Sequence, residues 1–249
     1  MGRLRTLTSR TLDLLFPPTC LLCHGEVSRD GTSQLCQECG SILRPTRQSA
    51  CPRCALSCPA VLVAEEGCHR CRHKRFYFDG VWSLGVYRAD LREVVLRLKR
   101  PDGEALASYV GAKLAGYVNG QKTFQKPDFV LSVPMFWLRR ALRGTNASSS
   151  IASAVAASLH VPYREKMLKC CRYKKKQGTL RPSGRRKNVR GAFRLAKGYD
   201  IKGSRALLVD DVMTTGATAN ELSKVLKESG VRQVCVVVVA RGSGSQSYI

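Results

Sequence analysis

The segment from Arg205 to Ser229 constrains the fold of this chain more than any other. It begins with a short apolar run, Arg205 to Val209, which is typical of a strand buried on both faces of a parallel sheet. Gly216 to Ser229 follows with Leu222, Val225 and Leu226 spaced for one face of a helix. The segment therefore predicts a strand, a loop and a helix in an α/β fold with a parallel sheet.

The loop of this segment lies at the carboxyl end of the predicted strand, where open α/β sheets bind ligands. Backbone N–H groups of a glycine-containing loop that leads into a helix N-terminus form a cradle for phosphate. Two adjacent carboxylates, those of Asp210 and Asp211, precede this cradle. Because like charges repel, these carboxylates should face hydroxyl groups or a divalent cation bound to the phosphate. The alternative is a generic turn with threonine caps. The candidate ligand residues are Asp210, Asp211, Thr214, Thr215, Gly216, Ala217 and Thr218.

This combination resembles the phosphoribosyl-pyrophosphate (PRPP) motif of type I phosphoribosyltransferases. The resemblance implies that Asp210 and Asp211 bind the ribose hydroxyls. It also implies that residues 214–218 hold the 5-phosphate, and that Mg²⁺ accompanies PRPP if the protein is an active transferase.

Cysteine spacing predicts two structural zinc ions. Nine of the 12 cysteines fall between residues 20 and 71, and eight of them form four Cys-x-x-Cys pairs. Two such pairs supply the tetrahedral four-sulfur shell of structural zinc, and the arrangement of two pairs occurs twice. An iron–sulfur cluster and redox dithiols are the alternatives. The predicted ligands are Cys20, Cys23, Cys36 and Cys39, then Cys51, Cys54, Cys68 and Cys71, with Cys58, His24, His69 and His73 unassigned.

The cysteine pattern suits a reducing cytosol better than a secreted disulfide scaffold. No apolar run approaches the roughly 20 residues that span a membrane. Leu12 to Phe16 is too short and too interrupted for a signal peptide. A cytoplasmic location is therefore expected.

Positive charge is concentrated in one region. The chain has 42 Lys and Arg against 18 Asp and Glu, a net charge of +24. Residues 164–205 hold 16 basic and 2 acidic side chains, so their net charge is 16 − 2 = +14. This excess predicts an anionic partner such as a phosphorylated substrate or nucleic acid.

Two basic stretches are candidates for that contact. Residues 172–191 lack apolar periodicity and predict a mobile basic loop, which could close over pyrophosphate or grip a nucleic-acid backbone. A second, glycine-containing stretch follows the predicted strand Asp128 to Val133. In both stretches the alternative is a solvated surface. The pyrophosphate candidates are Arg140, Arg143, Lys174, Lys175 and Lys176.

Taken together, these segments resemble the ComF family, which joins an N-terminal double zinc ribbon to a type I phosphoribosyltransferase-like domain. The resemblance rests on Leu12 to Cys20, the paired cysteines, Arg143-Gly144-x-Asn146, Gln177 to Phe193 and Val209 to Thr218. Thr145 and Ala147 depart from the family's Arg-Gly-Phe-Asn-Gln motif, so the role of that loop here is in question. The expected fold is a parallel sheet flanked by helices with the double zinc ribbon before it.

Domain boundaries and function follow as expectations. We expect an N-terminal helix (1–16), the double zinc ribbon (17–75), the phosphoribosyltransferase-like domain (76–244) and a disordered tail (245–249). The resemblance implies a role in DNA uptake during natural competence, as a binding or adaptor protein with single-stranded DNA or competence-machinery proteins as partners. The alternative is an active transferase that passes ribose 5-phosphate from PRPP to a nitrogenous acceptor.

Overall fold

The chain folds as two units, Met1–Arg44 and Pro45–Ile249. The computed structural model describes residues 17–27, 33–45, 50–59, 63–64, 67–136, 146–172 and 182–242. The predicted N-terminal helix (1–16) and C-terminal tail (245–249) lie outside these ranges.

The first unit is built around its cysteines and one short helix, α2 (Gln37–Ile42). Cys36 precedes this helix, and its sulfur accepts a hydrogen bond from the Cys39 N–H at 3.5 Å. Leu35 and Leu43 are buried on either side of α2. Within residues 17–27 and 33–44 these two leucines are the only buried apolar side chains besides cysteines, so this part of the unit needs a contribution from its cysteines to be stable.

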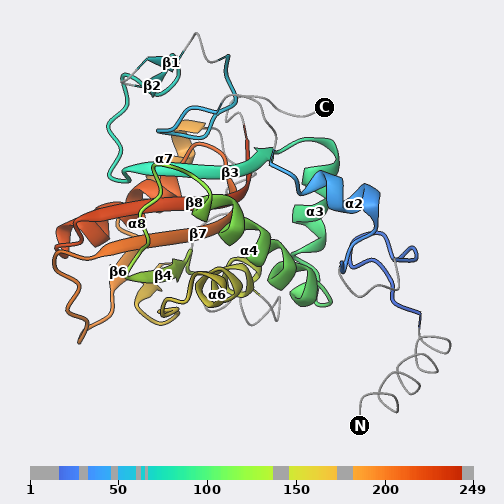
Figure 1. The fold of residues 1–249 in the computed structure, drawn as a ribbon. Coiled ribbons are helices and arrows are strands. Elements are labelled where there is room, and N and C mark those ends of the chain that lie inside the picture. Colours follow the sequence, from blue (N-terminus) through green and yellow to red (C-terminus); the bar gives the residue numbers. More distant parts are fainter. Residues whose placement is uncertain are drawn as a thin grey trace. The chain divides into compact units, whose positions relative to one another are not determined.

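The second unit contains a four-stranded parallel sheet (Figure 1). Its strands, in spatial order, are β3 (Gly80–Val86), β8 (Gln233–Arg241), β7 (Arg205–Met213) and β4 (Phe129–Ser132). All four residues of β4 are buried, as are Ala206 to Val209 of β7. The parallel sheet expected from the apolar runs is confirmed.

Helices cover both faces of this sheet. Helix α4 packs against α6, which contacts β4 and β7. On the other face, Leu222 and Leu226 of α8 share a core with Leu208 and Val236. Alternate residues of each strand thus point to opposite helical layers. The helices are α3 (Ala89–Arg97), α4 (Glu104–Asn119), α6 (Ala147–Leu159) and α8 (Ala217–Glu228).

Strand β7 is longer than its apolar run predicts. It continues through the acidic pair to Met213, because β8 pairs with it as far as Arg241. The acidic side chains therefore lie on the last residues of a paired strand, where the backbone is held on one side by β8.

Part of the predicted basic loop is helical. Helix α7 (Pro182–Val189) lies inside residues 172–191, so the prediction of a loop throughout that segment was wrong. Proline suits the first residue of a helix, and the buried Val189 anchors the other end. Two small antiparallel pairs complete the fold: β1 (Val63–Ala64) with β2 (Gly67–Cys68), and β5 (Leu168–Cys170) with β6 (Phe193–Leu195).

No helix in the described part of the chain is long and apolar enough to cross a lipid bilayer.

Candidate functional site

Asp210 is a partly buried carboxylate near the end of β7. Its Oδ1 accepts hydrogen bonds from Ser148 Oγ and from the Asp211 N–H, both at 2.9 Å. Ser148 belongs to the first turn of α6, so two elements distant in sequence meet here. Burial, and then the charge of Asp211, raise the pKa of Asp210 to about 7.

Asp211 has a different partner, the ammonium group of Lys99. Lys99 Nζ lies 2.7 Å from Asp211 Oδ2, and the Val212 N–H donates to Asp211 Oδ1 at 2.7 Å. Burial would lower the pKa of Lys99, but the charge of Asp211 and the hydrogen bond to it outweigh burial, so this pKa is raised. The ammonium group of Lys99 is therefore held in its charged form beside the Asp211 carboxylate.

A tight turn between α3 and α4 fixes the position of Lys99. Leu98 is buried, the Lys99 N–H donates to Leu96 O, and the Gly103 N–H closes onto Arg100 O at 3.0 Å. A Cβ on Gly103 would lie 2.5 Å from Arg97 O, so only glycine allows this approach. Sequence reasoning missed both Lys99 and Ser148; their only signal was their place beside predicted helix ends.

The predicted phosphate loop joins β7 to α8. Gly216 has φ 77°, a left-handed conformation that glycine adopts without strain, and α8 begins at the next residue. The Ala217 N–H donates to Thr215 Oγ1 at 3.3 Å. Three residues, Thr214 to Gly216, therefore separate the last strand residue, Met213, from the N-terminus of α8.

Arg241, at the end of β8, is buried behind this loop with 8% of its surface exposed. Its Nη1 donates to the carbonyl oxygens of Met213 (2.8 Å), Thr214 and Gly242, and its Nε donates to Cys54 O at 2.7 Å. Arg241 was not predicted, because an arginine after an apolar strand gives no sign that it is buried.

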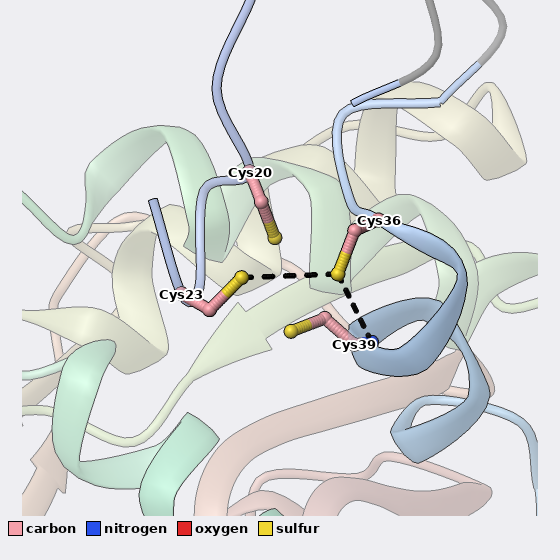
Figure 2. A group of neighbouring side chains, drawn as sticks. All are labelled: Cys20, Cys23, Cys36 and Cys39. Atoms are coloured by element: carbon pink, nitrogen blue, oxygen red, sulfur yellow. Dashed lines mark hydrogen bonds between the residues drawn. The ribbon is translucent and has the colours of Figure 1, made fainter. Parts of the chain in front are cut away.

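The first cysteine group, Cys20, Cys23, Cys36 and Cys39, has its four sulfurs within 4.8 Å of one another. Figure 2 shows the four side chains pointing toward a common centre. The Cys23 and Cys36 sulfurs are 3.7 Å apart. In a tetrahedron with zinc–sulfur bonds of about 2.3 Å the sulfurs are roughly 3.8 Å apart, so this group fits zinc.

The second cysteine group, Cys51, Cys54, Cys68 and Cys71, is fully buried and has the same geometry. Its sulfur separations of 3.6 and 3.7 Å again match a zinc tetrahedron. Burial, and then the charges of the other three cysteines, raise the pKa of the Cys54 thiol. A divalent cation is what allows four adjacent thiolates to remain ionised.

The unassigned cysteine and histidines lie outside these two groups. Cys58 is buried near the second group, and its sulfur is 3.5 Å from Leu56 O. His24, His69 and His73 are exposed. The two four-cysteine sets are those predicted from the spacing.

The predicted pyrophosphate residues cannot be placed relative to the acidic pair. Arg140 and Arg143, and Lys174 to Lys176, lie outside the described residues. The described neighbour Arg172 donates to Arg190 O at 2.7 Å, which joins the start of the basic segment to the end of α7.

Two family models match this chain. A double zinc ribbon domain matches residues 11–72, and a phosphoribosyl transferase domain matches residues 110–247, which is more than half of the chain.

Similar proteins span almost the whole chain. The DNA utilization protein YhgH of Escherichia coli (strain K12) is 29% identical over 231 residues, 92% of this chain and 99% of that protein. Competence protein F of Haemophilus influenzae is 26% identical over 228 residues, 89% of this chain and 96% of that protein. A solved glutamine phosphoribosylpyrophosphate amidotransferase from B. subtilis is 24% identical with a TM-score of 0.38, over 58% of this chain and 30% of that chain. At that TM-score the structure adds nothing to the family matches.

Proposed function

Because this chain belongs to the phosphoribosyl transferase domain family, and carries a double zinc ribbon before that domain, we propose that it binds a 5-phosphoribosyl group at residues 210–218. The ligand is PRPP or a ribose 5-phosphate compound. The observation that carries the proposal is the continuity of the acidic pair on β7, the glycine loop and the N-terminus of α8.

Each part of this segment suits one part of the ligand. Carboxylates accept hydrogen bonds from ribose hydroxyls, and a helix N-terminus with neighbouring threonine hydroxyls attracts phosphate. The ion pair with Lys99 at 2.7 Å cancels the charge of Asp211, so the acidic pair repels an incoming anion less.

Mg²⁺ entering with PRPP would supply charge neutralisation on the pyrophosphate. Asp210 and Asp211 are the carboxylates at this edge of the sheet, and their oxygen donors suit that ion. Ser148 and Lys99 hold the two carboxylates in place.

Calorimetry with ribose 5-phosphate tests the proposal. Asp211→Asn removes a charge-assisted contact with the ribose hydroxyls, and Thr215→Ala removes a phosphate donor, so each should weaken binding by roughly 10-fold. Asp90→Asn and Thr123→Ala are matched controls on exposed residues and should bind like the parent. Equal affinity in all five proteins would place the ligand elsewhere.

The same site suits a transferase. Positioning and charge stabilisation dominate such a reaction, and Arg140, Arg143 and Lys174 to Lys176 would neutralise the departing pyrophosphate. An assay of PRPP-dependent pyrophosphate release across candidate nitrogenous acceptors separates an enzyme from a binding protein. Release that requires an acceptor supports the enzyme, and PRPP binding without release supports the binding role.

We further propose a role in DNA uptake as a binding or adaptor protein. The names of the relatives, DNA utilization protein and competence protein, support this role, as does the net charge of +14 on residues 164–205. Single-stranded DNA is the partner that this charge suits, because a polyanion matches a dense basic segment better than one pyrophosphate does.

A further inference from the structure

Arg241 joins two parts of the second unit that are distant in sequence. A buried guanidinium needs compensation for its charge, and within the described residues none of the salt bridges involves it. It is compensated instead by backbone carbonyls on two sides. One side belongs to a cysteine turn and the other to the start of the predicted phosphate loop.

On the first side, Nε donates to the carbonyl of Cys54, a residue of the second cysteine group. The next residue, Ala55, is buried in the same apolar core as Phe78 and Met213. The Val81 N–H also donates to Pro52 O at 3.3 Å. The second cysteine group is therefore packed onto the sheet by apolar contacts as well as by Arg241.

On the other side, Nη1 donates to the carbonyls of Met213 and Thr214. In a trans peptide the C=O and the following N–H point in opposite directions. Carbonyls turned toward Arg241 therefore turn the N–H groups of Thr214 and Thr215 away from it. Gly242 packs against the same loop, since its N–H donates to Met213 O at 2.9 Å and an added Cβ would lie 3.1 Å from Thr214 Cγ2.

We propose that Arg241 is a positioning residue that couples the second cysteine group to the phosphate loop, so that metal at that group sets the affinity for sugar phosphate. The inference rests on the proposed 5-phosphoribosyl site. It makes the second half of the zinc ribbon a structural part of that site.

Electrostatics favours this coupling. Four thiolates around one Zn²⁺ carry a formal charge of −2, which is unfavourable in a buried site unless a cation or hydrogen-bond donors lie nearby. Burial lowers the pKa of Arg241, and the charges of Cys54, Cys68 and Cys71 oppose that effect. The arginine and the metal–thiolate centre therefore stabilise each other.

A pair of cysteine substitutions tests the coupling in the full-length protein. Elemental analysis and ribose 5-phosphate calorimetry are applied to Cys39→Ser and Cys68→Ser, one ligand from each group. We expect each variant to lose zinc from its own group. Affinity should stay within about 2-fold of the parent in Cys39→Ser and fall at least 10-fold in Cys68→Ser. Cys58→Ser, a buried thiol outside both groups, controls for local disturbance.

Substitution of the arginine gives the complementary test. Arg241→Met removes both sets of hydrogen bonds, and Arg241→Lys keeps the charge and part of the donor set. We expect affinity to fall about 10-fold in Arg241→Met and to be partly restored in Arg241→Lys, with two zinc ions per chain in both. The double variant Arg241→Met with Cys68→Ser should lose little more affinity for ribose 5-phosphate than either single variant, because both substitutions interrupt the same coupling.

Chelator titration of the Cys39→Ser protein covers the case in which Arg241→Met does not fold. Affinity should fall in step with the remaining zinc, which occupies the second group. Unchanged affinity in folded Arg241→Met, or after removal of that zinc, overturns the coupling alone. Absence of ribose 5-phosphate binding by the parent protein overturns the proposed site, and the coupling with it.

Discussion

Asp210 and Asp211 are adjacent in sequence, yet different neighbours compensate them. Asp210 is held by Ser148 and a backbone N–H, whereas Asp211 is paired with the ammonium of Lys99. With its pKa raised to about 7, Asp210 is partly protonated at neutral pH. In its protonated form Asp210 can donate a hydrogen bond as well as accept one.

This difference makes the effect of Asp210→Asn on stability depend on pH. The pKa of Asp210 is raised from 3.8 to about 7, so the folded chain binds a proton that the unfolded chain has lost. The free energy of unfolding therefore falls as pH rises from about 4 through 7. Asparagine does not titrate and so avoids this loss. The free energy of unfolding of Asp210→Asn, relative to that of the parent, should therefore rise by roughly 1 kcal/mol from pH 6 to pH 8.

Urea denaturation of both proteins at the two pH values measures this change. Protonation of the cysteines affects both proteins alike and cancels in the difference. If the difference in free energy of unfolding between the two proteins is the same at both pH values, Asp210 keeps an ordinary pKa.

Residues of this kind set the limit of sequence-based prediction for the site. The acidic pair and the glycine loop were predictable because they are contiguous. Lys99, Ser148 and Arg241 reach the segment only through tertiary packing, and each is an ordinary residue in its local sequence. Their roles depend on which helix or strand end lies beside β7, and no local pattern carries that information.

At the scale of elements, α4 and α6 approach each other closely at one glycine. A Cβ on Gly111 would lie 2.6 Å from both Ile151 O and Ala154 Cβ. The backbone of α6 cannot give way without shifting the turn that carries Ser148. The position of α6 against the sheet, and with it the partner of Asp210, therefore depends on this contact.

Alanine substitutions at two glycines of α4 should have opposite effects. Gly111→Ala should destabilise the protein by about 2 kcal/mol, because the added carbon overpacks the interface between the two helices. Gly116 is exposed on the same helix with nothing within 4 Å of its added carbon, so Gly116→Ala should stabilise the protein by roughly 0.5–1 kcal/mol. Urea midpoints of the two variants give the comparison. Similar effects at both positions would mean that helix propensity, rather than packing, decides the result.

The elements predicted best are those with strong apolar patterns. Strand β4 and helix α8 agree with their predicted ranges to within one residue at each end. Strand β7 extends four residues beyond its apolar run because pairing with β8 overrides the low strand propensity of two aspartates. Helix α7 was missed because its sequence, rich in charge and containing Gly184, has little apolar periodicity.

At the scale of the whole molecule, the two cysteine groups belong to different units. The first lies within Met1–Arg44 and the second within Pro45–Ile249. The similar spacing of the two groups in the sequence gave no sign of this division, which arises because Ala55 and Arg241 attach the second group to the sheet. The boundaries of 17–75 and 76–244 stay a prediction: they separate the cysteine repeats from the sequence after them, whereas the two units are defined by contacts such as these.

The distribution of charge over the molecule leads to the last prediction. If residues 172–190 follow a single-stranded DNA backbone, each neutralised phosphate releases condensed counterions, and affinity falls linearly on a log–log plot against salt. Changing Lys174, Lys175 and Lys176 together to alanine should flatten that slope by about 2 units, at roughly 0.7 per single-strand phosphate contact. The matched control changes the exposed Lys113, Lys122 and Lys126 to alanine, which alters net charge equally. The DNA contact lies in the basic segment if the parent and the control both show a steep slope and the slope of the first variant is flatter. Equal slopes in all three proteins, or no DNA affinity at low salt, would assign those lysines to the pyrophosphate of PRPP or to a protein partner.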